Sequence, residues 1–182
     1  MNLPIKWARV PERFPGPWVG IMSGLIDLGE WLEKFLSPRL VGYEIGSFAG
    51  ESMEVFAKYF DVFHCVDTFN DACEYPVLAD VEASFDIRAK AAGNVIKHVT
   101  TSREQAIVTP NGTADFVYID ACHLYEYVIE DIRYWLPKVR SGGIISGHDF
   151  IVDTPDVVRA VKEVFGEPDF VFADTSWIVR VP

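Results

Sequence analysis

The sequence lacks any long hydrophobic run. No segment reaches the roughly 18 consecutive apolar residues that a membrane-spanning helix requires. The first twenty residues hold four prolines and the basic residues Lys6, Arg9 and Arg13 without a continuous apolar stretch, which is not the pattern of a signal peptide. We therefore expect no membrane contact and a cytoplasmic location.

Basic residues are also scarce. Only 16 Lys and Arg stand against 27 Asp and Glu, so the formal net charge is −11. Proteins that bind nucleic acid gain much of their affinity from Lys and Arg that release counterions from phosphates. No dense basic run is present in this chain. The charge therefore argues against a nucleic-acid partner.

Cysteine is rare as well. The chain has three cysteines, Cys65, Cys73 and Cys122, and no C-x-x-C pair. An odd number without paired spacing does not predict a disulfide framework, and a reducing compartment fits better.

Hydrophobic residues, in contrast, make up 49% of the 182 residues, which is enough for one well-packed domain. Residues 1–20 are rich in proline and aromatic residues and predict an irregular arm, and residues 21–182 predict a single domain. The aromatic residues Trp7, Phe14 and Trp18 of the arm could cover a ligand or pack on a second subunit, and the sequence leaves both readings open.

Short apolar runs alternate with segments of helical spacing along the domain. Strands are expected at 40–45, 62–66, 95–99, 116–119, 143–146, 170–172 and 177–181. Helices are expected at 22–36, 51–59, 81–92, 102–107, 125–136 and 155–165. This alternation predicts an α/β fold with a Rossmann-like, doubly wound sheet that is mostly parallel, and the hairpin at 173–176 adds an antiparallel C-terminal strand.

The loop after the first strand has the features of a ligand-binding turn. Gly46 allows a sharp exit from the strand, and Gly50 allows close backbone approach near the start of the next helix. Glu44 ends the first strand and Asp67 ends the second, where an acid commonly binds the hydroxyls of a ribose. The two glycines alone would equally fit a tight connection. The pattern is not G-x-G-x-x-G, so a pyrophosphate is not indicated.

Acids and imidazoles follow two later strands. Asp120 and His123 come after the strand at 116–119, and His148 and Asp149 come after the strand at 143–146. Ligands of open α/β sheets bind outside the carboxyl ends of the strands, so these four residues predict an active site. Simpler explanations remain for each: Asp120 could cap the next helix, His123 could pack, and His148 could be structural.

Other polar and aromatic residues nearby carry less weight. Glu126 and Asp131, on the helix at 125–136, are expected to be solvated. Trp135 and Trp177 are expected to be packing residues.

Taken in order, these motifs resemble a known family. The series is E-I-G-S-x-x-G-x-S, V-D, D-F-V-Y-I-D-A-x-H-x-Y-E-x-V-x-x-D-I and G-G-I-I-S-G-H-D. It is similar to class I S-adenosylmethionine-dependent methyltransferases, and most of all to the branch with macrolide-sugar O-methyltransferases and cephalosporin-biosynthesis methyltransferases. The resemblance covers roughly residues 25–181. It implies a seven-stranded sheet with a reversed last strand.

The resemblance also implies roles for the residues around the cofactor. The methionine part of the cofactor would be lined by Glu44, Gly46, Ser47 and Gly50. Asp67 would hold its ribose. Thr68 and Ser102 would lie near its adenine, with Arg103 flanking. Asp120 would border the cofactor as well. Phe48 departs from the family, where many members have glycine.

On the acceptor side, the resemblance makes His123 the candidate general base and gives Asp120 and Asp149 a catalytic and metal-binding role. A hydroxyl needs a base, a metal that lowers its pKa, or both. Carboxylates suit Mg²⁺, and an imidazole at His148 would shift the preference toward metals such as Mn²⁺. The family often has an acid where this chain has His148.

The function predicted is therefore methylation of a hydroxyl on a small molecule, with S-adenosylmethionine as donor and Mg²⁺ or Mn²⁺ as a conditional cofactor. Three alternatives remain. A protein that binds S-adenosylmethionine without catalysis fits the same fold. A base methyltransferase would need N/D-P-P-Y/F where this chain has 119–122, and a nicotinamide oxidoreductase would need G-x-G-x-x-G and a Tyr-x-x-x-Lys pair. A homo-oligomer is left open.

Overall fold

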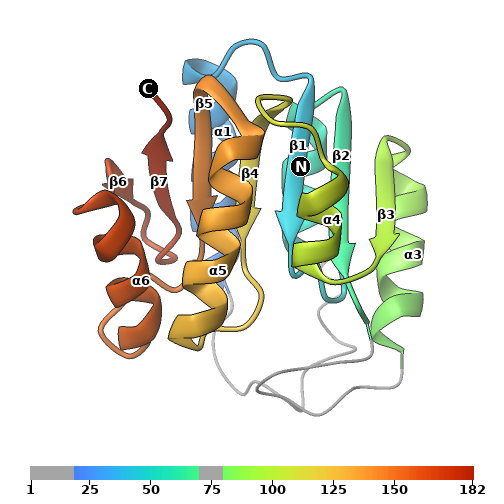
Figure 1. Ribbon diagram of the computed structural model, residues 1–182. Helices are drawn as coiled ribbons and strands as arrows, with labels where there is room; N and C mark the ends of the chain where they lie inside the picture. Colours follow the sequence, from blue (N-terminus) through green and yellow to red (C-terminus); the bar gives the residue numbers. More distant parts are fainter. Residues whose placement is uncertain (1–18, 70–79) are drawn as a thin grey trace.

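The structure, a computed structural model, describes residues 19–69 and 80–182 (Figure 1). The first helix, α1 (Val19–Phe35), already includes the last two residues of the predicted arm. The rest of that arm, with Trp7, Phe14 and Trp18, lies outside the described residues, and so does one of the three cysteines, Cys73.

Seven strands form one mixed sheet, as the sequence predicts. They are β1 (Val41–Ile45), β2 (Val62–Asp67), β3 (Val95–Val99), β4 (Ala114–Ile119), β5 (Val139–Gly147), β6 (Phe170–Val171) and β7 (Trp177–Arg180). Their order in the sheet is β3-β2-β1-β4-β5-β7-β6. Strands β1 to β5 pair in parallel, whereas β7 is antiparallel to both β5 and β6. The order of the strands switches sides at β1, with β2 and β3 on one side of it and β4 and β5 on the other. Doubly wound sheets bind ligands at such a switch point.

Helices cover both faces of the sheet (Figure 1). The remaining helices are α2 (Glu51–Phe56), α3 (Val81–Ala92), α4 (Ser102–Val108), α5 (Tyr125–Trp135) and α6 (Pro155–Phe165), with 3-10 turns η2 (Ala57–Tyr59) and η3 (Leu136–Lys138). One core cluster joins α1, α2 and α3 to one face of the sheet, and a second joins α4, α5 and α6 to the other. None of the helices in the described residues is long and apolar enough to cross a membrane.

The prediction for β5 is short by several residues. The strand begins at Val139. The prediction missed its first residues because Arg140 and Ser141 interrupt the apolar pattern, although they do not end the strand. A bulge opposite Ala114 and Phe116 accommodates this irregular start. The carboxyl end of β5 lies where the sequence places it, and that end carries His148 and Asp149.

Candidate active site

The carboxyl ends of the four central strands are level with one another. Ile45 of β1 is opposite Val66 of β2 and Ile119 of β4, and Ile119 is opposite Gly147 of β5. The next backbone amides continue the ladder: Gly46 donates to Val66, Asp120 donates to Ile45, and His148 donates to Ile119. This register brings the ends of β1, β2, β4 and β5 to one edge of the sheet, as the sequence predicts.

Gly46 is required at the end of β1. Its φ is +87°, in the left-handed region that glycine adopts most easily. A Cβ on this residue would lie 2.2 Å from the carbonyl oxygen of Asp120 and 2.6 Å from the Cα of Ala121. The turn after β1 therefore packs directly against the backbone that carries Asp120, so the loops after β1 and β4 form one unit.

Glu44 and Ser47 place unpaired polar atoms beside this turn. Glu44 is fully buried, and neither its Oε1 nor the Ser47 Oγ has a hydrogen-bond partner in the described residues. Burial raises the pKa of Glu44 to about 8, and the charges of Asp120 and Asp67 add to the effect, although a hydrogen bond with Ser52 opposes it. Buried polar atoms without partners are costly unless a ligand satisfies them. These two atoms suit a cationic, hydrogen-bonding group such as an amino-acid ammonium.

Asp67 lies on the other side of the same loop. Its two carboxylate oxygens accept hydrogen bonds from the amides of Phe48, at 2.7 Å, and Phe69, at 2.8 Å. These bonds fix the carboxylate, and each oxygen retains a further lone pair for a hydroxyl. Phe48 has a φ of +44°, in the left-handed region that glycine adopts most easily. Thr68 follows Asp67 directly at the end of β2.

Ser102 begins α4 and is turned toward α5. Its hydroxyl donates a short hydrogen bond to Asp131 and accepts one of 2.9 Å from the Trp135 indole. The prediction that Asp131 is solvated is therefore wrong, because this carboxylate is buried between the two helices. Trp135 and Trp177 are buried packing residues, as predicted.

We expect Asp131→Asn to remove a pH dependence of stability. Burial raises the pKa of Asp131 to about 6 from an ordinary 3.8. Between these pH values the folded protein holds a proton that the unfolded chain has lost, so the free energy of unfolding falls as the pH rises. Urea unfolding across this range should show a smaller decline for Asp131→Asn than for the unchanged protein. Glu126→Gln, at an exposed position of the same helix, is the control, and an equal decline in Asp131→Asn would contradict the expectation.

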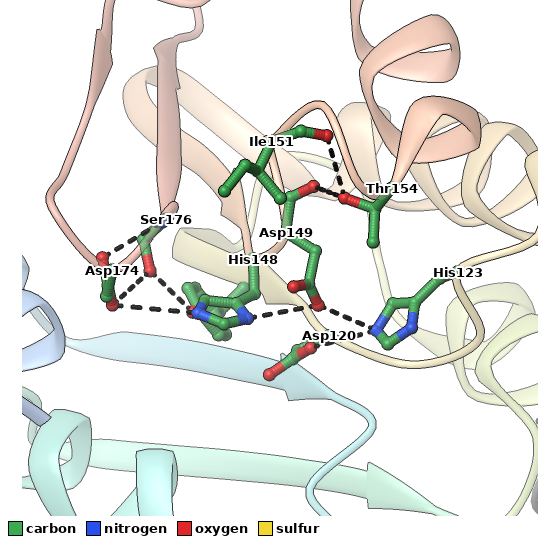
Figure 2. A network of polar contacts seen from close by, with 9 residues as sticks. Asp120, His123, His148, Asp149, Ile151, Thr154, Asp174 and Ser176 are labelled. Carbon is green, nitrogen blue, oxygen red and sulfur yellow. Dashed lines mark hydrogen bonds and ion pairs between the residues drawn. The ribbon is translucent and has the colours of Figure 1, made fainter. Parts of the chain in front are cut away.

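The acids and imidazoles after β4 and β5 do meet (Figure 2). The His123 Nε2 lies 3.0 Å from the Asp149 Oδ2 and 3.7 Å from the Asp120 Oδ1. The His148 Nδ1 lies 3.2 Å from the same Asp149 oxygen. All four side chains are mostly buried but keep some contact with solvent.

Mutual attraction stabilises the charged forms of this cluster. Hydrogen bonds to Asp120 and Asp149 raise the pKa of His123 to about 11, despite partial burial. Burial alone would raise the pKa of Asp149, but the hydrogen bonds to His123 and His148 hold it well below its usual range. His123 is therefore an imidazolium at neutral pH, and in this state it cannot accept a proton.

A divalent cation fits the donor set. One ligand atom each from Asp120, His123 and Asp149 lies within 4.8 Å of the others. Two carboxylates and one imidazole are ligands that Mg²⁺ or Mn²⁺ accepts. His148 is not among these three residues, so its predicted role as a metal ligand stays a prediction.

Two of the simpler explanations can be compared with the structure. The residue before α5 is Leu124, whose side chain makes no capping hydrogen bond, and the first backbone amide of the helix, that of Tyr125, donates to Asp156 at 3.3 Å. Asp120 therefore does not cap this helix. His123 contacts carboxylates instead of packing in the core.

The cysteines differ from the prediction as well. Cys122 is disulfide-bonded, which the odd number of cysteines did not predict, whereas Cys65 is a buried thiol.

The comparison with protein families decides what this edge of the sheet belongs to. A family model described as a methyltransferase domain matches residues 43–150, more than half of the chain, from β1 to the residue after Asp149. The chain belongs to this methyltransferase family. It is a class I S-adenosylmethionine-dependent methyltransferase, with S-adenosylmethionine as the methyl donor.

Solved structures share the fold at low sequence identity. The O-methyltransferase TomG from Streptomyces achromogenes, involved in tomaymycin synthesis and solved with S-adenosylmethionine, is 14% identical with a TM-score of 0.63, over 87% of this chain and 79% of TomG. Cofactor-bound Rv0187 from MTB is 16% identical with a TM-score of 0.59, over 100% and 99%. A Corynebacterium glutamicum protein is 10% identical with a TM-score of 0.63, over 99% and 98%. No curated protein matches the sequence.

Proposed function

We propose that this methyltransferase transfers a methyl group from S-adenosylmethionine to a hydroxyl of a small molecule, with a divalent metal and His123 as general base. The observation that carries the proposal is the meeting of Asp120, His123 and Asp149 beside the loop after β1. The order of the motifs resembles that of the macrolide-sugar and cephalosporin branch, and this resemblance supports a small-molecule acceptor. TomG, which has the same fold, is an O-methyltransferase, and this supports oxygen as the acceptor atom.

In the proposed reaction the acceptor oxygen attacks the methyl carbon of the sulfonium. The new oxygen–carbon bond forms as the carbon–sulfur bond breaks, so the sulfonium leaves as a neutral thioether. The hydroxyl proton passes to the Nε2 of His123. Holding the two reactants in line accounts for much of the rate gain in such reactions.

The metal and the base depend on each other in this proposal. Asp120 and Asp149 would hold the metal, and a bound divalent cation lowers the pKa of a hydroxyl that coordinates it. The same two carboxylates hold the proton on His123. If their charge were shared with a cation that His123 itself does not coordinate, the pKa of His123 would fall and its imidazole would be able to accept the hydroxyl proton.

On the donor side, Glu44 and Ser47 would receive the methionine part of S-adenosylmethionine, and Gly46 and Gly50 would let it approach the backbone. Asp67 would bind the ribose, with Thr68 and Ser102 near the adenine. The unpaired Oε1 of Glu44 and Oγ of Ser47 support this assignment. The hydroxyl of Ser102 already bonds to Asp131 and Trp135, so a contact to adenine would come from the Ser102 backbone.

We expect Glu44→Gln to weaken binding of S-adenosylmethionine by roughly 10–100-fold, because glutamine cannot become a carboxylate opposite the ammonium of the methionine part, and a hydrogen bond between charged groups contributes about 1.5–3 kcal/mol. The free energy of unfolding should not fall, since the substitution removes a buried acid whose pKa is raised to about 8. Titration calorimetry and urea unfolding measure the two quantities. Glu54→Gln, on α2 next to the loop, is the control. Unchanged affinity in Glu44→Gln would remove this residue from the proposed donor site.

Oxygen specificity is tested with methyl-labelled S-adenosylmethionine, Mg²⁺ or Mn²⁺, and a panel of small hydroxyl compounds matched to amines of the same skeleton. We expect label in a hydroxyl compound and a loss of transfer when a chelator removes the metal. Label in the amines alone would overturn the oxygen assignment. Transfer that survives the chelator would overturn the metal.

A further inference from the structure

A line of alternating acids and imidazoles runs from the interior to the active site (Figure 2). Asp174 lies in the turn between β6 and β7, and its Oδ2 is 4.0 Å from the Nε2 of His148. His148 Nδ1 is 3.2 Å from the Asp149 Oδ2, which is 3.0 Å from the His123 Nε2. Residues from three separate loops thus lie one after another along this line, each within 4.0 Å of the next.

Burial of Asp174 at this position costs free energy of folding. Its side chain is completely buried, and a buried carboxylate needs compensating partners. The backbone amide of Ser176 donates to one oxygen at 3.1 Å, and the Ser176 hydroxyl donates to the other at 2.9 Å. Among the described residues, His148 is the basic group within 4.0 Å of this carboxylate. A carboxylate that served the turn alone could sit in solvent.

The first helix makes room for Asp174. Gly24 is buried in the interior of α1, and a Cβ there would lie 2.3 Å from the Asp174 Cγ and 2.4 Å from its Oδ1. Glycine in the interior of a helix is unfavourable relative to alanine. Position 24 therefore holds a residue of low helix propensity, and the side chain of Asp174 occupies the space that a larger residue would fill.

The imidazole of His148 has one clear hydrogen-bond partner. Its Nδ1 faces Asp149, while its Nε2 is buried and makes no hydrogen bond within the described residues. The carboxylate of Asp174, 4.0 Å away, lies on the Nε2 side of the ring. The backbone of Asp149 is held separately, because the Thr154 hydroxyl donates to its carbonyl oxygen. His148 and Thr154 together fix the side chain and the main chain of Asp149.

We propose that Asp174 is a positioning residue of the active site: it orients His148, and His148 in turn holds Asp149 toward His123 and Asp120. In this arrangement His148 supports the carboxylate of Asp149, which would hold the metal, and is not itself a metal ligand. The inference rests on the proposed function for its metal, but the orientation of the side chains does not depend on it. Such supporting partners of ligands are worth about 10–100-fold in metal affinity in other proteins.

The first test follows the histidine rings by nuclear magnetic resonance of the full chain with ¹⁵N-labelled histidine. Asp174→Asn removes the charge but preserves the shape, and we expect it to shift the ring signals of both His148 and His123. Ser176→Ala removes another partner of the same carboxylate and leaves its charge, so the His123 signals should stay in place. Unchanged His123 signals in folded Asp174→Asn would overturn the proposal. His148→Gln tests the same link if Asp174→Asn does not fold, with the same expected shift of His123.

The second test measures Mn²⁺ binding by electron paramagnetic resonance. We expect Asp174→Asn to bind Mn²⁺ about 10–100-fold more weakly, and Ser176→Ala to bind it as the unchanged protein does. The double variant His148→Gln with Asp174→Asn should bind Mn²⁺ no more weakly than His148→Gln alone. Additive losses in the double variant, or normal binding in Asp174→Asn, would overturn the path through His148. If the unchanged protein binds no Mn²⁺ while it still binds S-adenosylmethionine, the metal in the proposed function fails, and the ring signals still decide the role of Asp174.

Discussion

Replacing Gly46 by alanine should lower the free energy of unfolding by about 2–5 kcal/mol. The left-handed backbone costs an L-residue about 1–2 kcal/mol, and forcing a methyl group into a packed site costs about 1–3 kcal/mol more. The atoms in its way are backbone atoms, the Asp120 carbonyl oxygen at 2.2 Å and the Ala121 Cα at 2.6 Å, so no side chain can rotate to relieve the clash. The loops after β1 and β4 would have to separate, and binding of S-adenosylmethionine should be lost with them.

Gly93→Ala is the matched control. Gly93 follows α3 with a φ of +82°, close to that of Gly46, but a Cβ there would meet no atom within 4 Å. It should therefore lose only the conformational part, about 1–2 kcal/mol. Urea unfolding and calorimetry with S-adenosylmethionine measure both variants. Equal losses of stability in the two would mean that the contact between the loops after β1 and β4 does not matter.

Replacing His123 by glutamine should lower the rate of methyl transfer by about 10²–10⁴-fold, the usual contribution of a general base. Glutamine keeps a polar side chain near Asp120 and Asp149 but cannot take up the proton of the acceptor. Binding of S-adenosylmethionine should change little, because most of the proposed donor side lies in the loops after β1, β2 and β3. The measurement is the turnover of an accepted hydroxyl compound with saturating donor and metal, across a range of pH.

The pH profile separates a base from a residue that merely shapes the site. If His123 accepts the proton, activity of the unchanged protein should rise with pH as its imidazolium loses a proton, and metal should move this rise to lower pH. His123→Gln should show no such rise. His98→Gln is the control, since His98 lies on the edge strand β3 and its ring pairs with His64 at 2.8 Å. A rise that persists unchanged in His123→Gln would show that another group is the base.

Much of the arrangement of the candidate active site could be predicted because it depends on local patterns. Buried parallel strands appear as short apolar runs, and the residue that follows each run lies at the carboxyl end. Asp67, Asp120 and His148 were placed at one edge of the sheet by this reasoning, and the level ends of β1, β2, β4 and β5 agree. The seven strands and the antiparallel β7 were also expected.

Residues whose role depends on a distant partner could not be predicted. Asp131 is an acid on an amphipathic helix and gives no sign that Ser102 and the Trp135 indole will enclose it. Asp174 lies in a hairpin turn, where acids are common, and only the fold places it near His148 and against Gly24. The pKa of about 11 for His123 likewise follows from its distances to two carboxylates.

By itself, the sequence determined the alternation of strands and helices, the strand ends that carry the candidate active site, and the family that the motifs resemble. It could do so because backbone conformation and the period of apolar residues are local properties. Only the tertiary structure decided which acid faces which imidazole, which of them fits a metal, and how Asp174 supports them. Those contacts join residues far apart in the chain, and their energies depend on distance and burial, which the order of residues does not specify.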